Sequence, residues 1–399
     1  MNAPVKTATL SGSPAVAAER DLRLDLFRGL ALWLIFLDHI PSNIVAWITI
    51  RNYGFSDATE IFVFISGYTA AFVYGKAMLE RGPVVATARI WRRAWTVYIA
   101  HMFLFVIFMA EIAYIGASFK NPLYAEEMNI LEFLQQPDVT LLQALLLKFK
   151  PANMDVLPLY VVLLLTLPLV LWILQRAPWF ALIGSIVMWV IVQRVDINFP
   201  AYPSGGWYFN PFAWQVLFVL GAWCAIAGKQ TLNWILRSRL VLLVAVAYVI
   251  FGFAITLTWH LPNLAGYIPR WLFNRIYPID KTNLDILRLC HFMALAVITV
   301  RLIPITWPGL KSPLLRPAIL CGQHSLEIFC LGVFLAFTAH FILTEFSNRI
   351  SMQVTLSVVG ILIMVAVSAL LRWYKVIEGR RPGQKPPKAG ASLAGGEAA

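Results

Sequence analysis

The chain has 399 residues, of which 60% are hydrophobic and only 13% are charged. Its mean hydropathy of +0.73 excludes an ordinary soluble domain and predicts a protein that is embedded in a lipid bilayer. The formal net charge of +12 follows from the loop charges described below, so the charge requires no nucleic-acid partner.

About ten apolar runs have the length that a helix needs to cross a bilayer. They lie near residues 26–48, 58–75, 93–115, 156–174, 178–194, 211–228, 239–259, 286–303, 318–343 and 351–373. Runs of alternating ten-residue strands are not apparent, so the pattern predicts an all-α integral membrane protein, a polytopic bundle of about ten transmembrane helices. We expect this transmembrane domain to cover residues 21–378. Residues 1–20 and 379–399 have the composition of disordered tails.

Lys and Arg residues are concentrated in alternate loops. They include Arg20 and Arg23 before the first run, Lys76, Arg81 and Arg89 between the second and third, Lys229 and Arg237 between the sixth and seventh, Lys311 and Arg316 between the eighth and ninth, and Arg372 onward after the tenth. Short positive loops stay in the cytoplasm, so both termini are expected there. No apolar segment precedes the Ala-rich residues 15–18, and the first run therefore reads as an uncleaved anchor in a bacterial-type inner membrane.

The segment from Asp25 to His39, at the start of the first apolar run, contains four ionisable residues, Asp25, Arg28, Asp38 and His39. Such residues are costly at membrane depth and usually face a bundle interior or a wet cavity. Arg28 and His39 are eleven residues apart, which places them on one helical face about 16 Å apart. If Arg28 marks the cytoplasmic edge, His39 lies near mid-membrane. Asp38 points about 100° away from His39 on a regular helix, so we expect a weaker role for it.

A basic segment opens the third apolar run. Arg89 and Arg93 are one helical turn apart, and Arg92 is adjacent to Arg93. Guanidinium groups at the start of a helix suit phosphates or carboxylates, and acyl-coenzyme A is an abundant large anion of the cytoplasm. Ordinary positive-inside anchoring, with contacts to anionic membrane lipids, explains the same residues.

Aromatic and amide side chains are densest in residues 202–215. This segment contains Trp207, Tyr208, Asn210, Trp214 and Gln215. Aromatic rings stack on sugars while amides bond hydroxyl groups, so the segment is a candidate carbohydrate platform. An interfacial aromatic belt with a Pro and Gly turn is the alternative, and composition alone favours it.

Near the ninth run, His324 and Glu327 have the i, i+3 spacing of one helical face. This pair could hold the imidazole in one tautomer or deliver a proton, and a simple helix-end pair is the alternative. The four cysteines show no CxxC spacing and read as small buried hydrophobes, so we expect no metal site.

Several motifs together resemble the membrane acyltransferase 3 superfamily. They are Asp25-x-x-Arg28-Gly29 followed by His39, the aromatic run from Glu60 to Ser66-Gly67, Arg89-x-x-Arg92-Arg93, and Gly322-x-x-Ser325. One departure is Leu331-Gly332, where the wider superfamily often has a His. The resemblance therefore supplies no second catalytic His at that place.

The resemblance is closer to one branch, the OpgC family, which succinylates osmoregulated periplasmic glucans. It rests on Asp38-His39, Leu157-Pro158-Leu159-Tyr160, the segment from Trp207 to Gln215, and Gly322 to Glu327. It implies about ten spans, an acyl-coenzyme A donor that is succinyl-coenzyme A, a glucan acceptor and no tightly bound cofactor.

These motifs suggest a role for each cluster. His39 is the expected general base, because an imidazole has an unperturbed pKa near physiological pH. Asp38, His324 and Glu327 are further catalytic candidates; Arg28, Arg89, Arg92, Arg93 and Ser66 are donor-binding candidates; Trp207, Tyr208, Asn210, Trp214 and Gln215 are acceptor-binding candidates. A transporter or flippase for a glycan or a lipid-linked substrate is the main alternative, because intramembrane charges fit it too. A subunit without chemistry is another.

Overall fold

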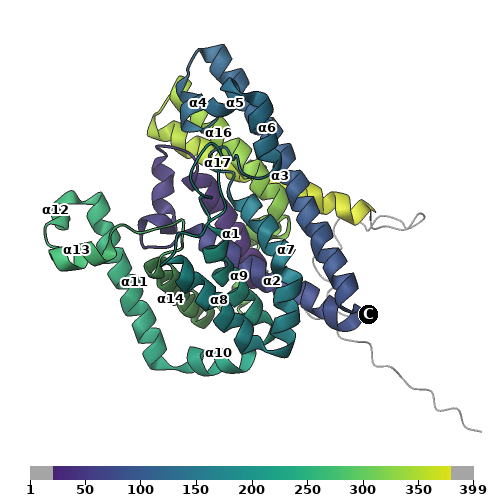
Figure 1. Cartoon of the computed structure of the whole chain (residues 1–399). Helices are drawn as coiled ribbons and strands as arrows, with labels where there is room; N and C mark the ends of the chain where they lie inside the picture. Colours follow the sequence, from purple (N-terminus) through teal and green to yellow (C-terminus); the bar gives the residue numbers. More distant parts are fainter. Residues whose placement is uncertain (1–20, 379–399) are drawn as a thin grey trace, which may run out of the picture.

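The computed structural model describes residues 21–378, and the predicted tails at 1–20 and 379–399 lie outside this range. The predicted all-α fold is confirmed for the described residues. Their one strand-like pairing is an isolated bridge between Pro200 and Gly206. Figure 1 shows a bundle of long helices with shorter helices at its ends.

The helices follow one another with short connections in most places. In chain order they are α1 (Leu22–Asp38), α2 (Ala58–Arg81), α3 (Pro83–Phe119), α4 (Leu123–Glu127), α5 (Leu131–Gln135), α6 (Pro137–Leu145), α7 (Val156–Arg176), α8 (Pro178–Val192), α9 (Pro211–Ile226), α10 (Gly228–Arg237), α11 (Arg239–His260), α12 (Pro262–Ala265), α13 (Arg270–Ile276), α14 (Ile286–Leu302), α15 (Arg316–Gln323), α16 (Ser325–Glu345) and α17 (Ile350–Glu378). Three 3₁₀ helices complete the described part: η1 (Ile44–Ile48), η2 (Ile50–Asn52) and η3 (Pro308–Lys311).

Six of these helices are long and apolar enough to cross a membrane: α2, α3, α7, α11, α16 and α17. A bent pair made by α9 and residues Thr231–Arg237 of α10 would be a seventh span, with a bend of 102°. The apolar helix α8 has only 15 residues, and α1 and α14 have 17 each. The chain is therefore a multi-pass membrane protein, while the count of ten spans stays a prediction.

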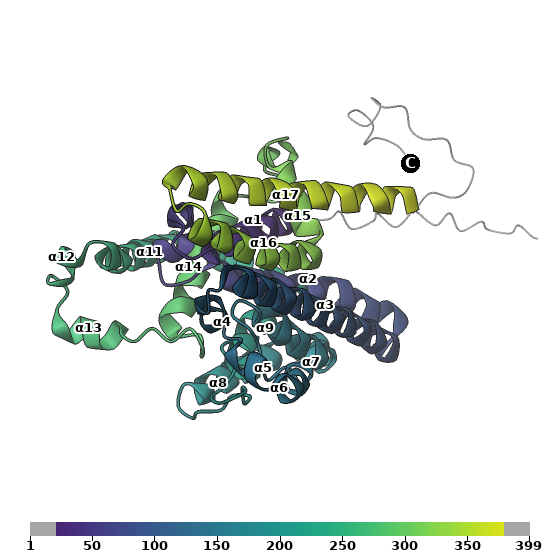
Figure 2. The same cartoon turned by 90° about the horizontal axis from the view of Figure 1, so that it is seen from above.

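Large apolar side chains cover the outside of the bundle. Phe103 of α3, Phe180 of α8, Leu243 of α11 and Leu362 of α17 are each more than half exposed. Figure 2 shows α11 and α17 at the edges of the bundle. An exposed apolar surface this extensive would be unstable in water, and it is the surface expected of helices that contact lipid.

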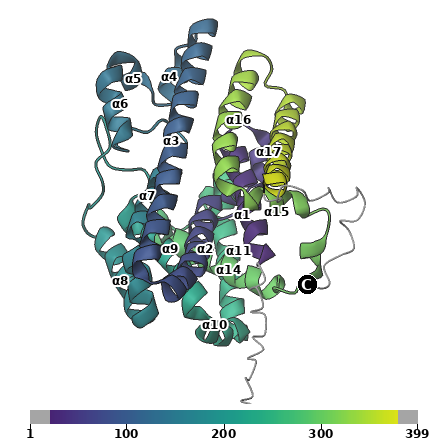
Figure 3. The ribbon, with the colours of Figure 1, turned by 90° about the vertical axis from the view of Figure 1, so that its right-hand side faces the viewer.

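The long helix α3 reaches beyond the thickness of a bilayer. Its 37 residues correspond to about 55 Å of helix, against about 30 Å of hydrocarbon. Figure 3 shows α4, α5 and α6 beside the end of α3 at Phe119, and α10 at the opposite end of the bundle. Tyr98 of α3 donates a hydrogen bond to the carbonyl of Leu145 at 3.0 Å, which ties α6 to α3.

Two helix crossings depend on glycine. A Cβ atom on Gly29 of α1 would lie 1.8 Å from the carbonyl oxygen of Ala318, and one on Gly322 of α15 would lie 1.8 Å from that of Asp25. The crossing of α2 and α9 is similar, since a Cβ on Gly67 would lie 2.0 Å from the Phe218 carbonyl oxygen. Such contacts let helix backbones approach closely. They place α1 firmly against α15 and explain both motif glycines.

Two predicted runs are interrupted. The run at 26–48 is not one helix, because α1 ends at Asp38 and the chain continues into η1. Pro41 explains this end, since a proline disfavours helical backbone at the residue before it. The run at 318–343 is divided at His324, whose backbone is not helical (φ −117°, ψ 40°). His39 therefore lies at the end of α1.

Candidate active site

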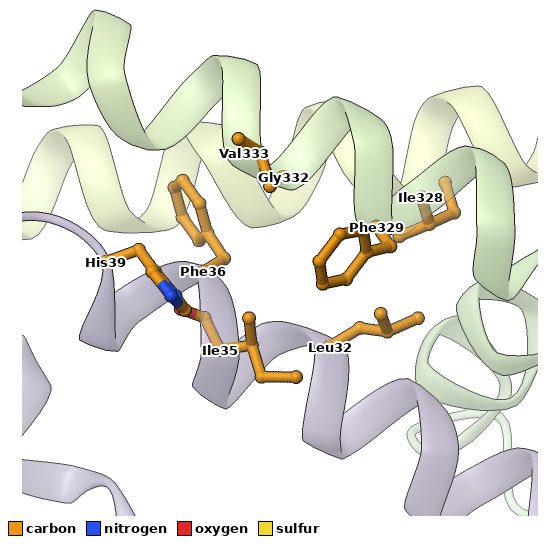
Figure 4. A pocket seen from close by; sticks show the side chains of 8 residues that line it. All are labelled: Leu32, Ile35, Phe36, His39, Ile328, Phe329, Gly332 and Val333. Carbon is orange, nitrogen blue, oxygen red and sulfur yellow. The ribbon is translucent and has the colours of Figure 1, made fainter. Parts of the chain in front are cut away.

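Two neighbouring cavities lie between α1 and α16. The larger has a volume of about 150 Å³. It is lined by Arg28, Phe62, Ser66, Thr69, Ala70, Val73, Tyr74, Arg93, Leu157, Tyr160, Ser325, Leu326 and Phe329. The smaller, of about 10 Å³, is lined by Leu32, Ile35, Phe36, His39, Ile328, Phe329, Gly332 and Val333 (Figure 4). Phe329 lines both cavities, so the cavity at Arg28 and the cavity at His39 adjoin at this ring.

The hydrogen bond of His39 defines its tautomer. Its Nδ1 lies 2.5 Å from the carbonyl oxygen of Ile35, one turn earlier in α1. A carbonyl can only accept, so Nδ1 carries the proton, and Nε2 of the neutral ring keeps its lone pair. The other residues that line this cavity are apolar. His39 is thus set up to accept a proton at Nε2.

Asp38 does not orient His39. Its carboxylate accepts a hydrogen bond from the hydroxyl of Thr49 at 2.7 Å, and the imidazole bonds to its own helix instead. This separation agrees with the directions expected for adjacent residues of a helix. The charges that act on His39 come from Lys281, Asp57 and Arg51.

A buried polar cluster joins the start of α2 to α14 and to the loop before it. We call Asp57, Glu60, Lys281 and Arg288 the ionic cluster. Asp57 Oδ2 lies 2.6 Å from Lys281 Nζ and 3.1 Å from an Arg288 nitrogen, and Glu60 Oε1 lies 2.6 Å from the same guanidinium. Burial alone would raise the pKa of Asp57, but the two cations outweigh it and hold this pKa well below its usual range.

The ionic cluster was not predicted from the sequence. Asp57 and Glu60 form a capping box at the start of α2, which is a signal that the spacing Asp57-x-x-Glu60 could have given. Arg288 stands out as a charge inside the apolar run at 286–303. Lys281 is separated from Asp57 by 224 residues, so no local pattern indicates their contact.

The larger cavity gathers three of the predicted donor-binding residues, Arg28, Arg93 and Ser66. Arg28 donates to the Thr69 hydroxyl at 2.5 Å, which directs the guanidinium toward α2. Arg89 does not line the cavity, although its charge and that of Arg93 both act on Tyr74 in the cavity wall. Arg92 is exposed and is not part of the lining.

The predicted pair of His324 and Glu327 does not lie on one continuous helix. The backbone breaks at His324, between α15 and α16, so the i, i+3 spacing does not place the two side chains on one helical face. His324 is buried, with Nδ1 3.4 Å from Lys375 Nζ of α17, whereas Glu327 is exposed. The structure thus places these two residues in different surroundings and outside both cavity linings.

The aromatic segment is mostly structural. Trp214 is fully buried and its Nε1 donates to the carbonyls of Lys281 and Thr282. Asn210 bonds Ile197 and Asn283, Gln215 bonds Ser185, and buried Trp207 lies under the Lys150 ammonium at 4.1 Å. Of the five predicted acceptor-binding residues, Tyr208 alone is strongly exposed, at 49%. Of the predicted platform, the ring of Tyr208 is therefore the one that is accessible to a sugar.

The fold and the site define a class: a polytopic helical membrane protein with a half-buried histidine at a cavity that adjoins a second cavity lined by two arginines. A family model described as OpgC protein matches residues 20–376, and the chain therefore belongs to the OpgC family. In general terms this makes it a glucan-modifying membrane transferase. The chain matches no curated protein and no solved structure. Within residues 21–378, no group of three or more His, Cys, Asp or Glu residues could hold a metal ion.

Proposed function

We propose that this protein transfers a succinyl group from succinyl-coenzyme A to hydroxyl groups of a periplasmic glucan, at the bacterial inner membrane. The observation that carries the proposal is the 2.5 Å contact between His39 Nδ1 and the Ile35 carbonyl oxygen. A carbonyl can only accept, so Nδ1 is the donor and Nε2 is left to act as the base. The cavity beside His39 adjoins, at Phe329, the cavity lined by Arg28 and Arg93. Membership of the OpgC family supports a glucan acceptor.

The donor enters from the end of the bundle that carries Arg28, Arg89 and Arg93, which faces the cytoplasm in this proposal. The ten helices α1, α2, α3, α7, α8, α9, α11, α14, α16 and α17 then cross the membrane, and both termini are cytoplasmic. A cavity of about 150 Å³ is smaller than a typical ligand pocket. It therefore takes the thioester arm of the donor, while the phosphates stay at the mouth with the arginines.

The chemical step is an acyl transfer with one proton shuttle. Nε2 of His39 removes the proton of a glucan hydroxyl as its oxygen attacks the thioester carbonyl. The tetrahedral intermediate then collapses, the carbon–sulfur bond breaks, and the imidazolium returns the proton to the departing thiolate. The products are a glucan ester and free coenzyme A, and His39 is restored to its neutral form.

Phe329 separates donor and base in the described state. The cavity at His39 has room for about one water molecule, at about 10 Å³. An acyl group therefore reaches His39 only when the ring of Phe329, which packs 6.1 Å from that of Phe62, moves aside. Closure of this kind keeps the thioester from the base until the donor is loaded, which limits its hydrolysis.

The test measures transfer of labelled succinyl groups from succinyl-coenzyme A to glucan by purified protein in detergent. His39→Gln should lower the rate by about 10²- to 10⁴-fold, the usual contribution of a general base. Asp38→Asn, next to it but bonded to Thr49, should lower it much less. Size-exclusion profiles check folding. Full activity of His39→Gln would refute the role of His39, and glucan movement across vesicles without thioester turnover would favour a transporter.

A further inference from the structure

Lys281 is the most accessible member of the ionic cluster. Its side chain is 27% exposed, whereas Asp57 and Arg288 are at 10% and Glu60 is at 0%. An ammonium group has three N–H donors. Among the described residues, Asp57 is the one acceptor found for the Lys281 ammonium. Two N–H groups of the Lys281 ammonium therefore remain to bind a ligand.

The position of Lys281 is fixed by the aromatic segment. The indole of Trp214 bonds the carbonyl of Lys281 at 3.1 Å, and Asn210 bonds the carbonyl of Thr282. The rings of Tyr208 and Phe209 lie 5.8 Å and 5.5 Å from the ammonium. Burial lowers the pKa of Lys281, but the charge of Asp57 outweighs this and raises it, so the group stays protonated. It is a preorganised cation rather than a mobile surface lysine.

Lys281 is tied to the cavity region through α2. Its ion-pair partner Asp57 is five residues before Phe62, which lines the larger cavity. Lys281 itself lines neither cavity. Its charge acts on both Asp38 and His39, yet no hydrogen bond joins Lys281 to either of them in the described structure. A group that stabilises the oxyanion must contact the carbonyl that reacts beside His39. The free carboxylate of a succinyl thioester lies two methylene groups further away, about 4 to 5 Å by ordinary bond lengths. The placement of Lys281 fits the second position better.

We propose that Lys281 binds the free carboxylate of the donor's acyl group and so selects dicarboxylic acyl groups over neutral ones. This inference rests on the proposed acyl transfer beside His39. The other cations fit less well. Arg288 is held between two carboxylates, and Arg51 is exposed on η2 without a partner that would fix it in the described structure.

The experiment compares succinyl-coenzyme A with butyryl-coenzyme A, whose acyl group has the same number of carbon atoms and no carboxylate. For the wild type, kcat/KM should be higher with the succinyl donor. Lys281→Met should lower kcat/KM for succinyl-coenzyme A about 10- to 100-fold, which is the effect expected when a hydrogen bond to a charged group is lost. The kcat/KM of this variant for butyryl-coenzyme A should stay within about threefold of the wild-type value. Asp57 keeps its contact with Arg288 in this variant, which favours normal folding.

Two further variants make the result specific. Lys281→Arg should keep most of the preference, and Arg51→Met, which removes the other cation acting on His39, should keep all of it. Equal losses with both donors in Lys281→Met would overturn the inference and leave the proposed acyl transfer standing. So would a wild type without preference. A wild type that transfers neither acyl group would overturn the proposed function, and this inference with it.

Discussion

Replacing Gly29 with Ala tests whether the crossing of α1 and α15 fixes the site. The new Cβ would lie 1.8 Å from the Ala318 carbonyl oxygen, whereas contacts under 3.0 Å essentially never occur. The two backbones must therefore separate by more than 1 Å. Neither backbone can rotate away as a side chain would, so we expect a cost of about 1–3 kcal/mol, typical of overpacking. Because α1 carries Arg28 and His39, acyl transfer should fall as well.

The matched control is Gly184→Ala in α8, where an added Cβ meets nothing within 4 Å. Alanine is the better helix former, so this variant should be unchanged or more stable by up to about 1 kcal/mol. The assay is thermal loss of the monodisperse size-exclusion peak, followed by transfer activity on the folded fraction. If the melting temperature of Gly29→Ala is equal to or higher than that of Gly184→Ala, the close crossing of α1 and α15 does not position α1.

Two other predictions concern the donor cavity and the half-buried carboxyl of Asp155. Arg93→Gln should raise the KM for the acyl-coenzyme A donor about 10- to 100-fold. Arg92→Gln should raise it several-fold less, because Arg93 lines the cavity and Arg92 does not. Steady-state kinetics measure both KM values, and equal effects would refute this position of the donor. Burial raises the pKa of the Asp155 carboxyl from 3.8 to about 6. Between pH 3.8 and pH 6 this carboxyl is therefore protonated in the folded state and ionised in the unfolded state. Above pH 6 it is ionised in both states, and burial of its charge lowers the stability of the fold. Asp155→Asn should therefore melt above the wild type at pH 7.5, and the difference should shrink toward pH 5; a constant difference would contradict the assignment.

The features that the sequence could predict are local ones. Apolar runs define most helices, and the spacing of Arg28 and His39 places them on one face because it depends only on helix geometry. The basic segment at Arg89–Arg93 also reaches the larger cavity, which Arg93 lines. Helix ends were harder, since Pro41 and the break at His324 lie inside runs that remain apolar on both sides.

The features that the sequence could not predict depend on long-range contacts. Asp57 and Lys281 meet across 224 residues, and the loop that carries Lys281 is held by indole and amide groups of the aromatic segment. Composition suggested two roles for that segment, a sugar platform or an interfacial belt. The side chains of Asn210, Trp214 and Gln215 instead bond the protein, because a buried indole N–H or amide without a partner would cost about 1–3 kcal/mol. The indole N–H of Trp207 is the exception, since it is buried without a partner in the described structure.

The separation of eleven positions between Arg28 and His39 sets a fixed distance between the two ends of the proposed reaction. Along α1 they are separated by about 16 Å, the rise of three helical turns, and both line adjacent cavities. A donor held at Arg28 by its phosphates needs an extended arm to bring its thioester to His39, and the pantetheine arm of coenzyme A has this form. The close contact of Gly29 with Ala318 keeps α1 from sliding. In the proposed reaction, the motif of Arg28, Gly29 and His39 thus combines anion binding, helix position and proton transfer on one helix.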